Sequence, residues 1–504
     1  METVIEGHVW IVLIVCALIL FYTYGKSPLY VWKTLGVPGP EPTVFFGNIH
    51  QLFDARVGVR HSVKQWQKQY GRIFGIYFFR KPVIVVTEPE ALKQIFVKDF
   101  NVFVDRFFVG DGRLQHRIIQ RTVFFSQGAT WRRLRKMMTP SFSSGKLKSL
   151  SPYINRTAHS LSDHAVTYAK QGKHLDAKVV FGAYALDVIA GTAFGLDLDS
   201  QSDHAAPFIR HAKSLMTIDK VVQLKLTLVG MFPAVIPLFR ALKIGYFKRR
   251  DIKFFSDNLQ ALIAERITSG KSNADFLQLL MEAEFDSSDP DSADKKLTSE
   301  EVAAQCLFFM IAGYDTTSTT LQYLFYELVR HQDVQGKIVA EILSVVGASG
   351  EPSYDHCQKL KYLEAAIEET LRMYPPLHIL TRKTTRDTTL NGVFIPANSG
   401  VLIPAYNIGR DPEFFRDPDT FVPERFLDAD KHDVNPVTFL PFGYGSRQCI
   451  GMRLALMQLK LAAVHVLRRL KVVSATPEVL EIEDFSGTLV PKTPIQLFME
   501  VRSV

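Results

Sequence analysis

The chain has 504 residues, 47% hydrophobic and 22% charged, a composition that excludes a disordered chain and supplies enough apolar side chains for a large core. Its formal charge of +8 favours an anionic membrane surface or an acidic protein partner, but the basic residues are scattered, so we expect no nucleic acid partner. Its four widely spaced cysteines argue against a disulfide framework and against structural zinc.

An unbroken apolar run from Val9 to Phe21 begins the chain and predicts a transmembrane anchor. A cleaved signal peptide is the alternative, because the run is shorter than the ~20 residues of a comfortable spanning helix. Glu2 and Glu6 oppose cleavage, since they precede the run where a signal peptide carries positive charge. Lys26 and Lys33 follow the run, so the positive-inside rule predicts that the rest of the chain lies in the cytosol.

A proline-rich stretch, VPGPEP at residues 37–42, follows the apolar run. It cannot continue a helix and predicts a semi-rigid linker. We therefore expect an anchor at residues 1–25, a linker at residues 26–50 and one large catalytic domain at residues 51–504.

Two β-favouring pairs of segments lie in this large domain, and most of the remainder has helical periodicity. Arg72–Tyr77 and Val83–Thr87 predict one hairpin. Val393–Ile395 and Val401–Ile403, on either side of Asn398-Ser399-Gly400, predict a second, small hairpin. The sequence therefore predicts a mainly α fold with minor β.

Residues 224–247 are apolar but are interrupted by Pro233 and Pro237, which makes them a poor spanning helix. Two interpretations stay open. The segment is either a core helix-turn-helix or a surface segment that dips into the bilayer beside the anchor.

A long helix is predicted from Thr298 to about Arg330, where Thr298 and Glu301 have the spacing of a capping box. Its middle carries AGYDTT at residues 312–317, with glycine and hydroxyl residues where a packed helix usually has leucine or alanine. This composition indicates either a kink or a close approach of another group to the backbone.

Near the end of the chain, FGYGSRQCIG at residues 442–451 precedes a helical pattern from Met452 to about Leu470. The glycines predict a tight loop that brings Cys449 to the N-terminus of a helix. Free backbone N–H groups and the helix dipole there stabilise a thiolate. A lone cysteine without such flanking residues is more often a buried core residue.

This loop fills the pattern Phe-x-x-Gly-x-Arg-x-Cys-x-Gly and resembles the haem-binding loop of the cytochrome P450 family. The resemblance covers nearly the whole chain and is closest to the microsomal branch of broad-specificity drug- and steroid-oxidising enzymes. Three further signatures agree in order and spacing, namely AGYDTT at 312–317, Glu369-Thr370-Leu371-Arg372 and Phe421-Val422-Pro423-Glu424-Arg425-Phe426.

The resemblance implies a cytochrome P450 fold, in which haem b (iron protoporphyrin IX) lies between the long helix and the cysteine-bearing loop. Cys449 is the expected metal ligand, and an axial thiolate favours cleavage of the O–O bond. Arginines suit the haem propionates because they bind carboxylates through two parallel donors. The expected haem-binding residues are Arg106, Trp131, Arg135, Arg382, Phe442, Arg447, Cys449 and Gly451.

The resemblance also implies a support for the cysteine side of the haem, formed by Glu369, Arg372 and Arg425. The alternative for Glu369 and Arg372 is an ordinary solvated ion pair on one helix face.

Asp315 and Thr316 occupy the acid-alcohol pair with which the family relays protons to oxygen, a task that a carboxylate and a hydroxyl can perform. We therefore expect a monooxygenase that inserts one oxygen atom from O2. The alternatives are a thiolate-haem isomerase or dehydratase that acts without O2, and a non-catalytic haem-binding membrane protein.

An apolar pocket lining implies a lipophilic substrate of the xenobiotic, steroid or fatty acid type. Phe107, Phe108, Phe124 and Phe125 lie in the family's variable loop before Trp131, where pocket residues are common, and each of the four is individually expected to be core. The expected pocket residues are Phe308, Phe309, Ala312, Leu377, Thr381 and Leu489.

Electrons must come from a separate protein, because the chain has no dinucleotide, flavin or iron–sulfur signature. The resemblance implies an NADPH-cytochrome reductase, with a cytochrome b-type protein as a further donor, at the endoplasmic reticulum membrane. A basic docking face for an acidic partner is one interpretation, and a solvated helix face is the other. The candidate docking residues are Arg133, Lys136, Arg453 and Lys460.

Overall fold

The computed structural model describes residues 2–52, 58–108, 112–202, 207–216, 220–270, 273, 275–283, 296–427, 434–483 and 488–502. These residues are mainly helical, and their strands form three small sheets, which confirms the predicted fold class. The chain divides into two compact units, which we describe separately. Unit 1 comprises Met1–Leu114, Asp219–Tyr246 and Ile379–Pro404, and unit 2 comprises Gln115–Ile218, Phe247–His378 and Ala405–Val504.

Unit 1 contains a four-stranded sheet of order β1-β2-β7-β4. β1 (Ile73–Phe78) and β2 (Lys81–Val86) form the first predicted hairpin. β2 pairs in parallel with β7 (Gly400–Ile403), and β7 pairs antiparallel with β4 (Leu380–Lys383). Apolar residues of β1, β2 and β7 are buried in the core of the unit.

The second predicted hairpin is wrong in its pairing. β6 (Val393–Ile395) pairs with β5 (Thr388–Leu390), whereas β7 pairs with β2 and β4. Asn391 and Gly392 connect β5 to β6 with φ angles of 46° and 82°. Two positive φ angles in a two-residue loop suit the twist of a hairpin, so Asn-Gly was the stronger turn signal.

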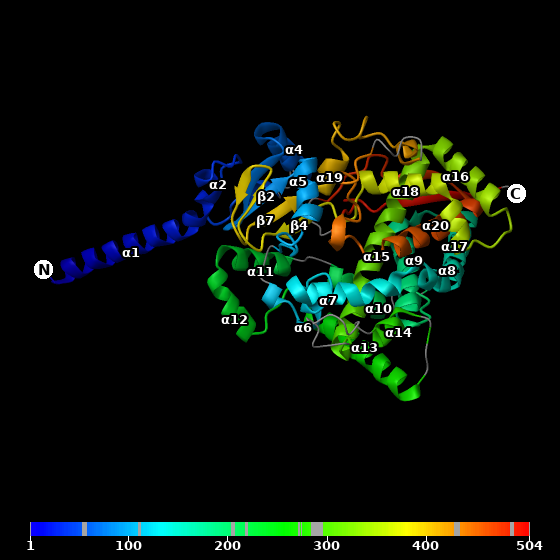
Figure 1. Cartoon of the computed structure of the whole chain (residues 1–504), viewed down its shortest axis with the longest axis horizontal. Coiled ribbons are helices and arrows are strands. Elements are labelled where there is room, and N and C mark those ends of the chain that lie inside the picture. The colour runs from blue at the N-terminus through cyan, green and yellow to red at the C-terminus, as the bar shows by residue number, and fades with distance from the viewer. Residues whose placement is uncertain are drawn as a thin grey trace. The chain divides into compact units, whose positions relative to one another are not determined.

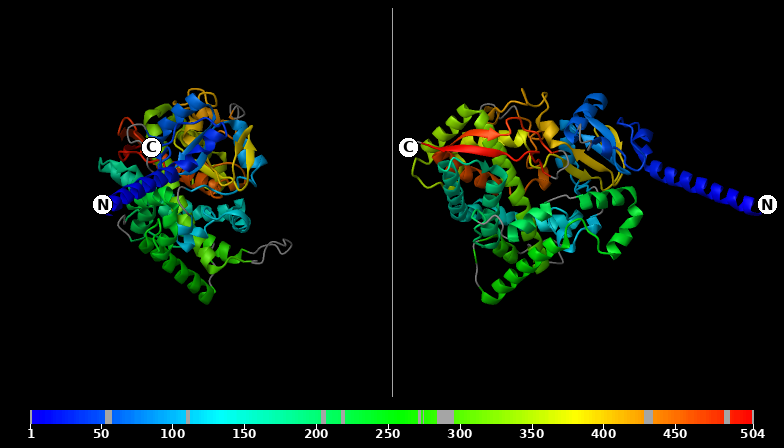
Figure 2. Two further views of the ribbon diagram at one scale, coloured as in Figure 1. Left: turned by 90° about the vertical axis from the view of Figure 1, so that its left-hand side faces the viewer. Right: turned by 180° about the vertical axis from the view of Figure 1, so that it is seen from behind.

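Helix α1 (Glu2–Lys26) extends away from the sheet of unit 1 (Figures 1 and 2). Its apolar side chains are exposed, with Trp10 at 66% and Leu20 at 68%. By length and hydropathy, His8–Thr34 can span a membrane. The apolar helix α9 (Ala177–Phe194) also passes this test, but 83% of it is buried, as in a core helix.

The proline-interrupted segment is a bent helix pair that is partly buried and partly exposed. The chain bends by 112° between α11 (Lys220–Met231) and the helical segment that follows it. That segment consists of η5 (Pro233–Val235) and α12 (Ile236–Ala241). One side packs into a cluster of Leu114, Val229, Ile236 and Tyr246. The pair also exposes large apolar side chains, which are Val221, Leu224, Leu238 and Leu242. Its contact with a bilayer stays a prediction.

The remaining elements of unit 1 surround the sheet. The proline-rich stretch packs against β1, because Gly75 N donates to Pro38 O at 2.8 Å.

The boundaries of anchor, linker and catalytic domain given in the sequence analysis stay predictions. The other helices are η1 (Ser27–Tyr30), α2 (Val31–Thr34), α3 (Ile49–Leu52), α4 (Val59–Tyr70), α5 (Pro89–Lys93), η2 (Gln94–Lys98) and η3 (Gly112–Leu114).

Unit 2 is built around α15 (Ser299–Arg330), which contacts α9, α18 (Lys361–Met373) and α20 (Met452–Arg469) (Figure 1). The predicted capping box is confirmed, since Glu301 N donates to Thr298 Oγ1 at 3.2 Å and Thr298 N donates to Glu301 Oε2 at 3.0 Å.

A three-stranded antiparallel sheet completes unit 2, with β9 (Gln496–Val501) between β3 (Leu175–Asp176) and β8 (Leu470–Thr476). The remaining helices are α6 (Arg117–Gln120), α7 (Gly128–Met138), η4 (Thr139–Phe142), α8 (Ser144–Lys170), α10 (Pro207–Met216), α13 (Arg249–Ser269), α14 (Phe276–Glu282), α16 (Gln332–Val345), α17 (Tyr354–Lys359), α19 (Ala405–Gly409), η6 (Pro423–Phe426) and η8 (Gly445–Arg447).

Candidate active site

The cysteine loop ends at the N-terminus of α20. Gly443 and Gly445 have φ angles of 69° and 70°, which favour glycine and allow the tight turn. Cys449 N donates to Phe442 O at 2.8 Å and closes the loop, and Gly451 is the N-cap of α20. Cys449 itself is exposed. The loop therefore presents a thiol at a helix N-terminus instead of packing it into the core.

Three of the predicted haem-binding residues gather with Cys449 in unit 2. The guanidinium of Arg447 lies over the ring of Trp131 at 4.2 Å, and its Nη2 donates to Ser126 O at 2.9 Å. Burial lowers the pKa of Arg135, whereas the negative charge of the Cys449 thiolate raises it. Among the residues that the structure describes, the Arg135 guanidinium has no hydrogen bond or ion pair. Such a half-buried cation suits an anionic group of a ligand, as a haem propionate is.

Arg106 and Arg382 belong to unit 1, where adjacent backbone segments carry them. Lys383 N donates to Asp105 O at 2.8 Å, and Thr381 Oγ1 donates to Phe107 O at 2.8 Å. Arg382 is 3% exposed, and its guanidinium lies over the ring of Phe96 at 5.2 Å. The structure thus brings these two arginines together in one unit and the other haem-binding candidates together in the second.

The middle of α15 is partly exposed, although nearly all of its other residues are buried. Between Glu301 and Leu328, five residues are half-buried and the rest are buried. The rest of the described chain therefore does not fully cover this part of the helix. The half-buried residues are Phe308, Ile311, Ala312, Gly313 and Thr316.

A helix packing contact explains the glycine in this segment. A Cβ atom at Gly313 would lie 2.4 Å from Ile189 Cδ1 of α9. The close approach that the sequence indicated at this position is therefore that of α9. The helical assignment continues without a break through residues 312–317.

The other pocket candidates are distributed differently. Phe309 packs against Phe142 and Phe276 at 5.4 and 5.7 Å and is 8% exposed, so the structure places it in the core and not in the half-buried set. Leu377 and Thr381 are half-buried. Leu489 is fully buried, and its N–H donates to Pro376 O at 3.0 Å.

The carboxylate of Asp315 is hydrogen-bonded at one oxygen, and its other oxygen is buried. Lys178 Nζ of α9 donates to Asp315 Oδ1 at 2.7 Å and to Ser318 Oγ at 2.8 Å. Asp315 Oδ2 is buried without a hydrogen-bond partner among the described residues. Thr316 Oγ1 donates back to Ala312 O at 2.8 Å. Sequence reasoning missed Lys178, because nothing local links two residues that are 137 positions apart.

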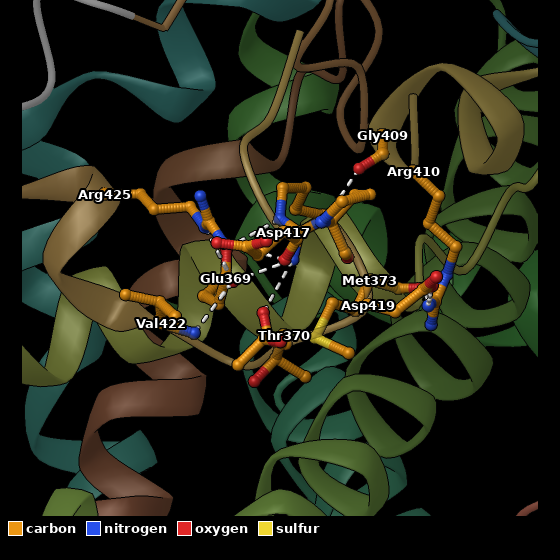
Figure 3. A network of polar contacts seen from close by, with 12 residues as sticks. Glu369, Thr370, Met373, Gly409, Arg410, Asp417, Asp419, Val422 and Arg425 are labelled. Carbon is orange, nitrogen blue, oxygen red and sulfur yellow. Dashed lines mark hydrogen bonds and ion pairs between the residues drawn. The ribbon is translucent and has the colours of Figure 1, made fainter. Parts of the chain in front are cut away.

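The predicted contacts among Glu369, Arg372 and Arg425 are present, and Glu369 and Arg372 are buried (Figure 3). Arg372 Nε and Nη2 donate to the two carboxylate oxygens of Glu369, each at 2.7 Å, and both side chains are fully buried. Arg425 Nε and Val422 N also reach Glu369 Oε1, at 3.3 and 2.9 Å. Arg372 Nη1 donates to Gly409 O at 2.6 Å. The network therefore ties α18 to α19 and η6 and is no solvated ion pair.

Two of the four candidate docking residues are engaged inside unit 2. Arg133 forms an ion pair with Glu301. Lys460 is 3% exposed and donates to Glu364 Oε2 at 2.6 Å. A buried lysine cannot contribute to a docking surface, so the prediction is wrong for Lys460. The remaining two, Lys136 and Arg453, are exposed.

Comparison with known proteins identifies the family. The family model described as Cytochrome P450 matches residues 37–499. The chain belongs to the cytochrome P450 family. It is 37% identical to cytochrome P450 3A29 of Sus scrofa over 91% of the chain and 89% of that protein. It is 36% identical to cytochrome P450 3A25 of Mus musculus, over 92% and 90%, and 35% identical to cytochrome P450 3A5 of Homo sapiens, over 98% and 96%.

Membership of the family confirms several predictions. This cytochrome P450 is a haem-thiolate monooxygenase of lipophilic compounds such as xenobiotics and steroids, and it uses haem b. An isomerase or dehydratase is not favoured. NADPH-cytochrome reductase supplies its electrons, and enzymes of this type sometimes use a cytochrome b-type protein as a further donor. The protein lies in the endoplasmic reticulum membrane with α1 as its single-pass anchor and the catalytic domain facing the cytosol.

Proposed function

We propose that Cys449 is the iron ligand and that Arg135, Trp131 and Arg447 bind the haem propionates from unit 2. One observation carries this assignment. The thiol of Cys449 is exposed, and its negative charge raises the pKa of the half-buried Arg135. The Arg135 guanidinium has no carboxylate partner among the described residues. Arg382, a buried cation of unit 1, and Arg106 stay predictions as further propionate ligands. When bound, the haem supplies the activation of O2.

The proposed role of the loop is to keep the sulfur deprotonated and correctly placed. The N-terminus of α20 stabilises negative charge on Cys449 Sγ through its free N–H groups and dipole. The hydrogen bond from Cys449 N to Phe442 O fixes the backbone of Cys449 and so the position of its sulfur. Glu369, Arg372 and Arg425 then act as positioning residues, because they rigidify the segments that follow α18.

Asp315 and Thr316 are the proposed proton-delivery residues. Lys178 holds Asp315 Oδ1, so that Oδ2 is the oxygen available to take a proton from water and pass it on. The hydroxyl of Thr316, on the half-buried part of α15, can accept a proton while it donates its own. The bond to Ala312 O is the one that Thr316 must release to do so.

The test of the assignment is the absorbance of the reduced protein under carbon monoxide. The parent protein should show the band typical of a thiolate-ligated haem, and Cys449→Ser should lose it together with turnover. Arg135→Leu should retain the band but bind haem more weakly, because one cation for the propionates is gone. A parent protein without the thiolate band, or a Cys449→Ser variant with unchanged turnover, contradicts the proposal.

A further inference from the structure

Two stacked tyrosines lie buried in unit 2. Tyr323 belongs to α15, and Tyr374 follows the last residue of α18. Their rings are parallel to within 10° at a centroid distance of 4.5 Å, the offset-stacked range of aromatic pairs. The two residues are only 0% and 6% exposed. Neither phenol has a part in the haem binding or the proton delivery proposed above.

The phenol of Tyr374 donates to a buried carboxylate. Tyr374 Oη donates to Glu327 Oε1 at 2.6 Å, which is the length of a charge-assisted hydrogen bond. Burial, and then the charge of Glu327, raise the pKa of Tyr374, while Arg410 opposes them. The phenol therefore keeps its proton at neutral pH and holds it against a strong acceptor.

A route out of the core exists for that proton. Glu327 Oε2, the second carboxylate oxygen, lies 3.4 Å from Nδ1 of His331. Glu327 is 3% exposed, whereas His331 is half-buried and reaches solvent. Proton transfer requires groups that lie within hydrogen-bond reach of each other, directly or through one water. The sequence Tyr374, Glu327 and His331 meets this requirement from the buried phenol to the surface.

The tyrosine pair also adjoins the part of unit 2 in which the oxygen chemistry is proposed. Tyr323 lies seven residues beyond Thr316 on α15, which is about 10 Å along the helix axis. Tyr323 Oη donates to Leu489 O at 3.2 Å, and Tyr374 precedes Leu377 by three residues. Leu489 and Leu377 are both predicted pocket residues. Electrons cross distances of this order between redox groups in proteins without direct contact.

We propose that Tyr374 and Tyr323 are a redox-active pair that returns an electron to the haem after O2 or a hydroperoxide has oxidised it and no substrate is present to react. The inference rests on the proposed function, because it requires the haem to lie beside Thr316. Its benefit is that the oxidant is consumed by a replaceable electron instead of attacking the haem or the pocket.

The proposed step balances in electrons and protons. Tyr374 loses one electron, which passes to the haem by way of the stacked ring of Tyr323. Its O–H bond breaks at the same time, and the proton goes to the Glu327 carboxylate. The products are a neutral tyrosyl radical, a carboxylic acid and a haem that is reduced by one electron. One electron from the reductase and the proton held by Glu327 then restore the phenol.

The test is electron paramagnetic resonance of the haem-loaded, full-length protein, frozen within milliseconds of mixing with cumene hydroperoxide in the absence of NADPH and substrate. The parent should give a tyrosyl radical signal that narrows when its tyrosines are ring-deuterated. Tyr374→Phe should lose most of this signal, and its haem absorbance should bleach several-fold faster, because the oxidant stays at the haem. Tyr323→Phe should delay the signal several-fold.

Glu327→Gln separates a redox role from a packing role. It keeps both rings but removes the group that takes up the proton, so it should lose the signal as Tyr374→Phe does. Tyr362→Phe is the matched control, since Tyr362 also donates to a carboxylate, Glu424 Oε1 at 2.8 Å, but lies at the opposite end of α18. It should leave the signal and the bleaching rate unchanged.

The inference is overturned if the parent gives no tyrosyl radical, if Tyr374→Phe keeps the full signal, or if Tyr362→Phe loses as much of it. The carbon monoxide band of each protein is recorded as well. Its absence from the parent contradicts the proposed function, whereas an intact band without the radical contradicts only the inference.

Discussion

Lys178 near the start of α9 and Asp315 in the middle of α15 form an ion pair of 2.7 Å, although 137 residues separate them. Lys178 also donates to Ser318 and Thr319, so that it fixes one side of α15 through three side chains. The pair joins the two helices at the point where the proposed proton delivery takes place.

Replacing Lys178 by methionine should therefore impair proton delivery without removing the acid. Asp315 loses the bond that aims its free oxygen, and we expect product formed per NADPH consumed to fall roughly 10-fold to 100-fold. The solvent isotope effect on turnover should rise. Lys178→Arg should retain most of the product formed per NADPH consumed, which is the coupling of the reaction. The control Lys173→Met, at an exposed lysine, should leave this coupling unchanged. Normal coupling in Lys178→Met would show that Asp315 needs no such anchor.

Glu369→Gln should destabilise the protein strongly. The substitution leaves the fully buried Arg372 without its bidentate carboxylate, and breaking such a pair costs about 3–5 kcal/mol. Denaturant unfolding of the haem-loaded protein measures the loss. Asp355→Asn is the control, because its ion pair with Lys148 is exposed on both sides and is worth at most about 1 kcal/mol. Equal effects of the two substitutions would contradict a structural role for the network.

His465 should make the free energy of unfolding depend on pH in the mildly acidic range. Burial, and then the charges of Arg468, His159 and Arg469, lower the pKa of His465 to about 4, while Asp163 opposes them. The ring is 2% exposed, and its Nε2 donates to Asn155 Oδ1 at 2.7 Å.

The unfolded chain takes up a proton on this histidine near pH 6.5, but the folded protein does so only near pH 4. The contribution of His465 is therefore fully present above pH 6.5 and is lost as the pH falls toward 4, by about 3 kcal/mol. His465→Gln should flatten the unfolding free energy over this range in denaturant titrations. The exposed His61→Gln should not, and an unchanged slope in His465→Gln would contradict the assignment.

Gly313→Ala should perturb the packing of α9 on α15 and not the chemistry. The added methyl group overlaps Ile189, a clash that costs about 1–3 kcal/mol, whereas the better helix propensity of alanine returns about 1 kcal/mol. Pairing the change with Ile189→Ala should remove the clash, so a double-mutant cycle on the thermal midpoint should show strong coupling. Additive effects would mean that the two residues do not meet.

Local patterns predicted those parts of the fold that depend on neighbouring residues. The capping box at Thr298, the hairpin of β1 and β2, and the glycine turn before Cys449 all follow from short-range rules. The partner of β7 was mispredicted, because strand pairing across the sheet depends on the rest of unit 1 and not on the spacing of Val393 and Val401.

Local patterns could likewise name candidate site residues that lie within a motif, but not the way in which helices cover one another. A motif names Cys449 and Asp315, but it cannot show which faces of a helix are covered. Phe309 and its neighbour Phe308 have the same side chain, and only the packing of α14 and η4 distinguishes the buried ring from the half-buried one. Lys460 likewise looks like any surface lysine until Glu364 is found beside it.

The contacts at the C-terminal end of α1 have a consequence for how the enzyme rests on its membrane. Phe45 lies 4.5 Å from Phe21 and 5.5 Å from Phe232, and Arg80 donates to Tyr24 O at 2.9 Å. These contacts attach the C-terminal end of α1 to the rest of unit 1. If lipid sets the depth and tilt of α1, these contacts transmit that setting to unit 1, and with it to the exposed apolar side chains of the bent pair α11–α12, whose contact with a bilayer stays a prediction.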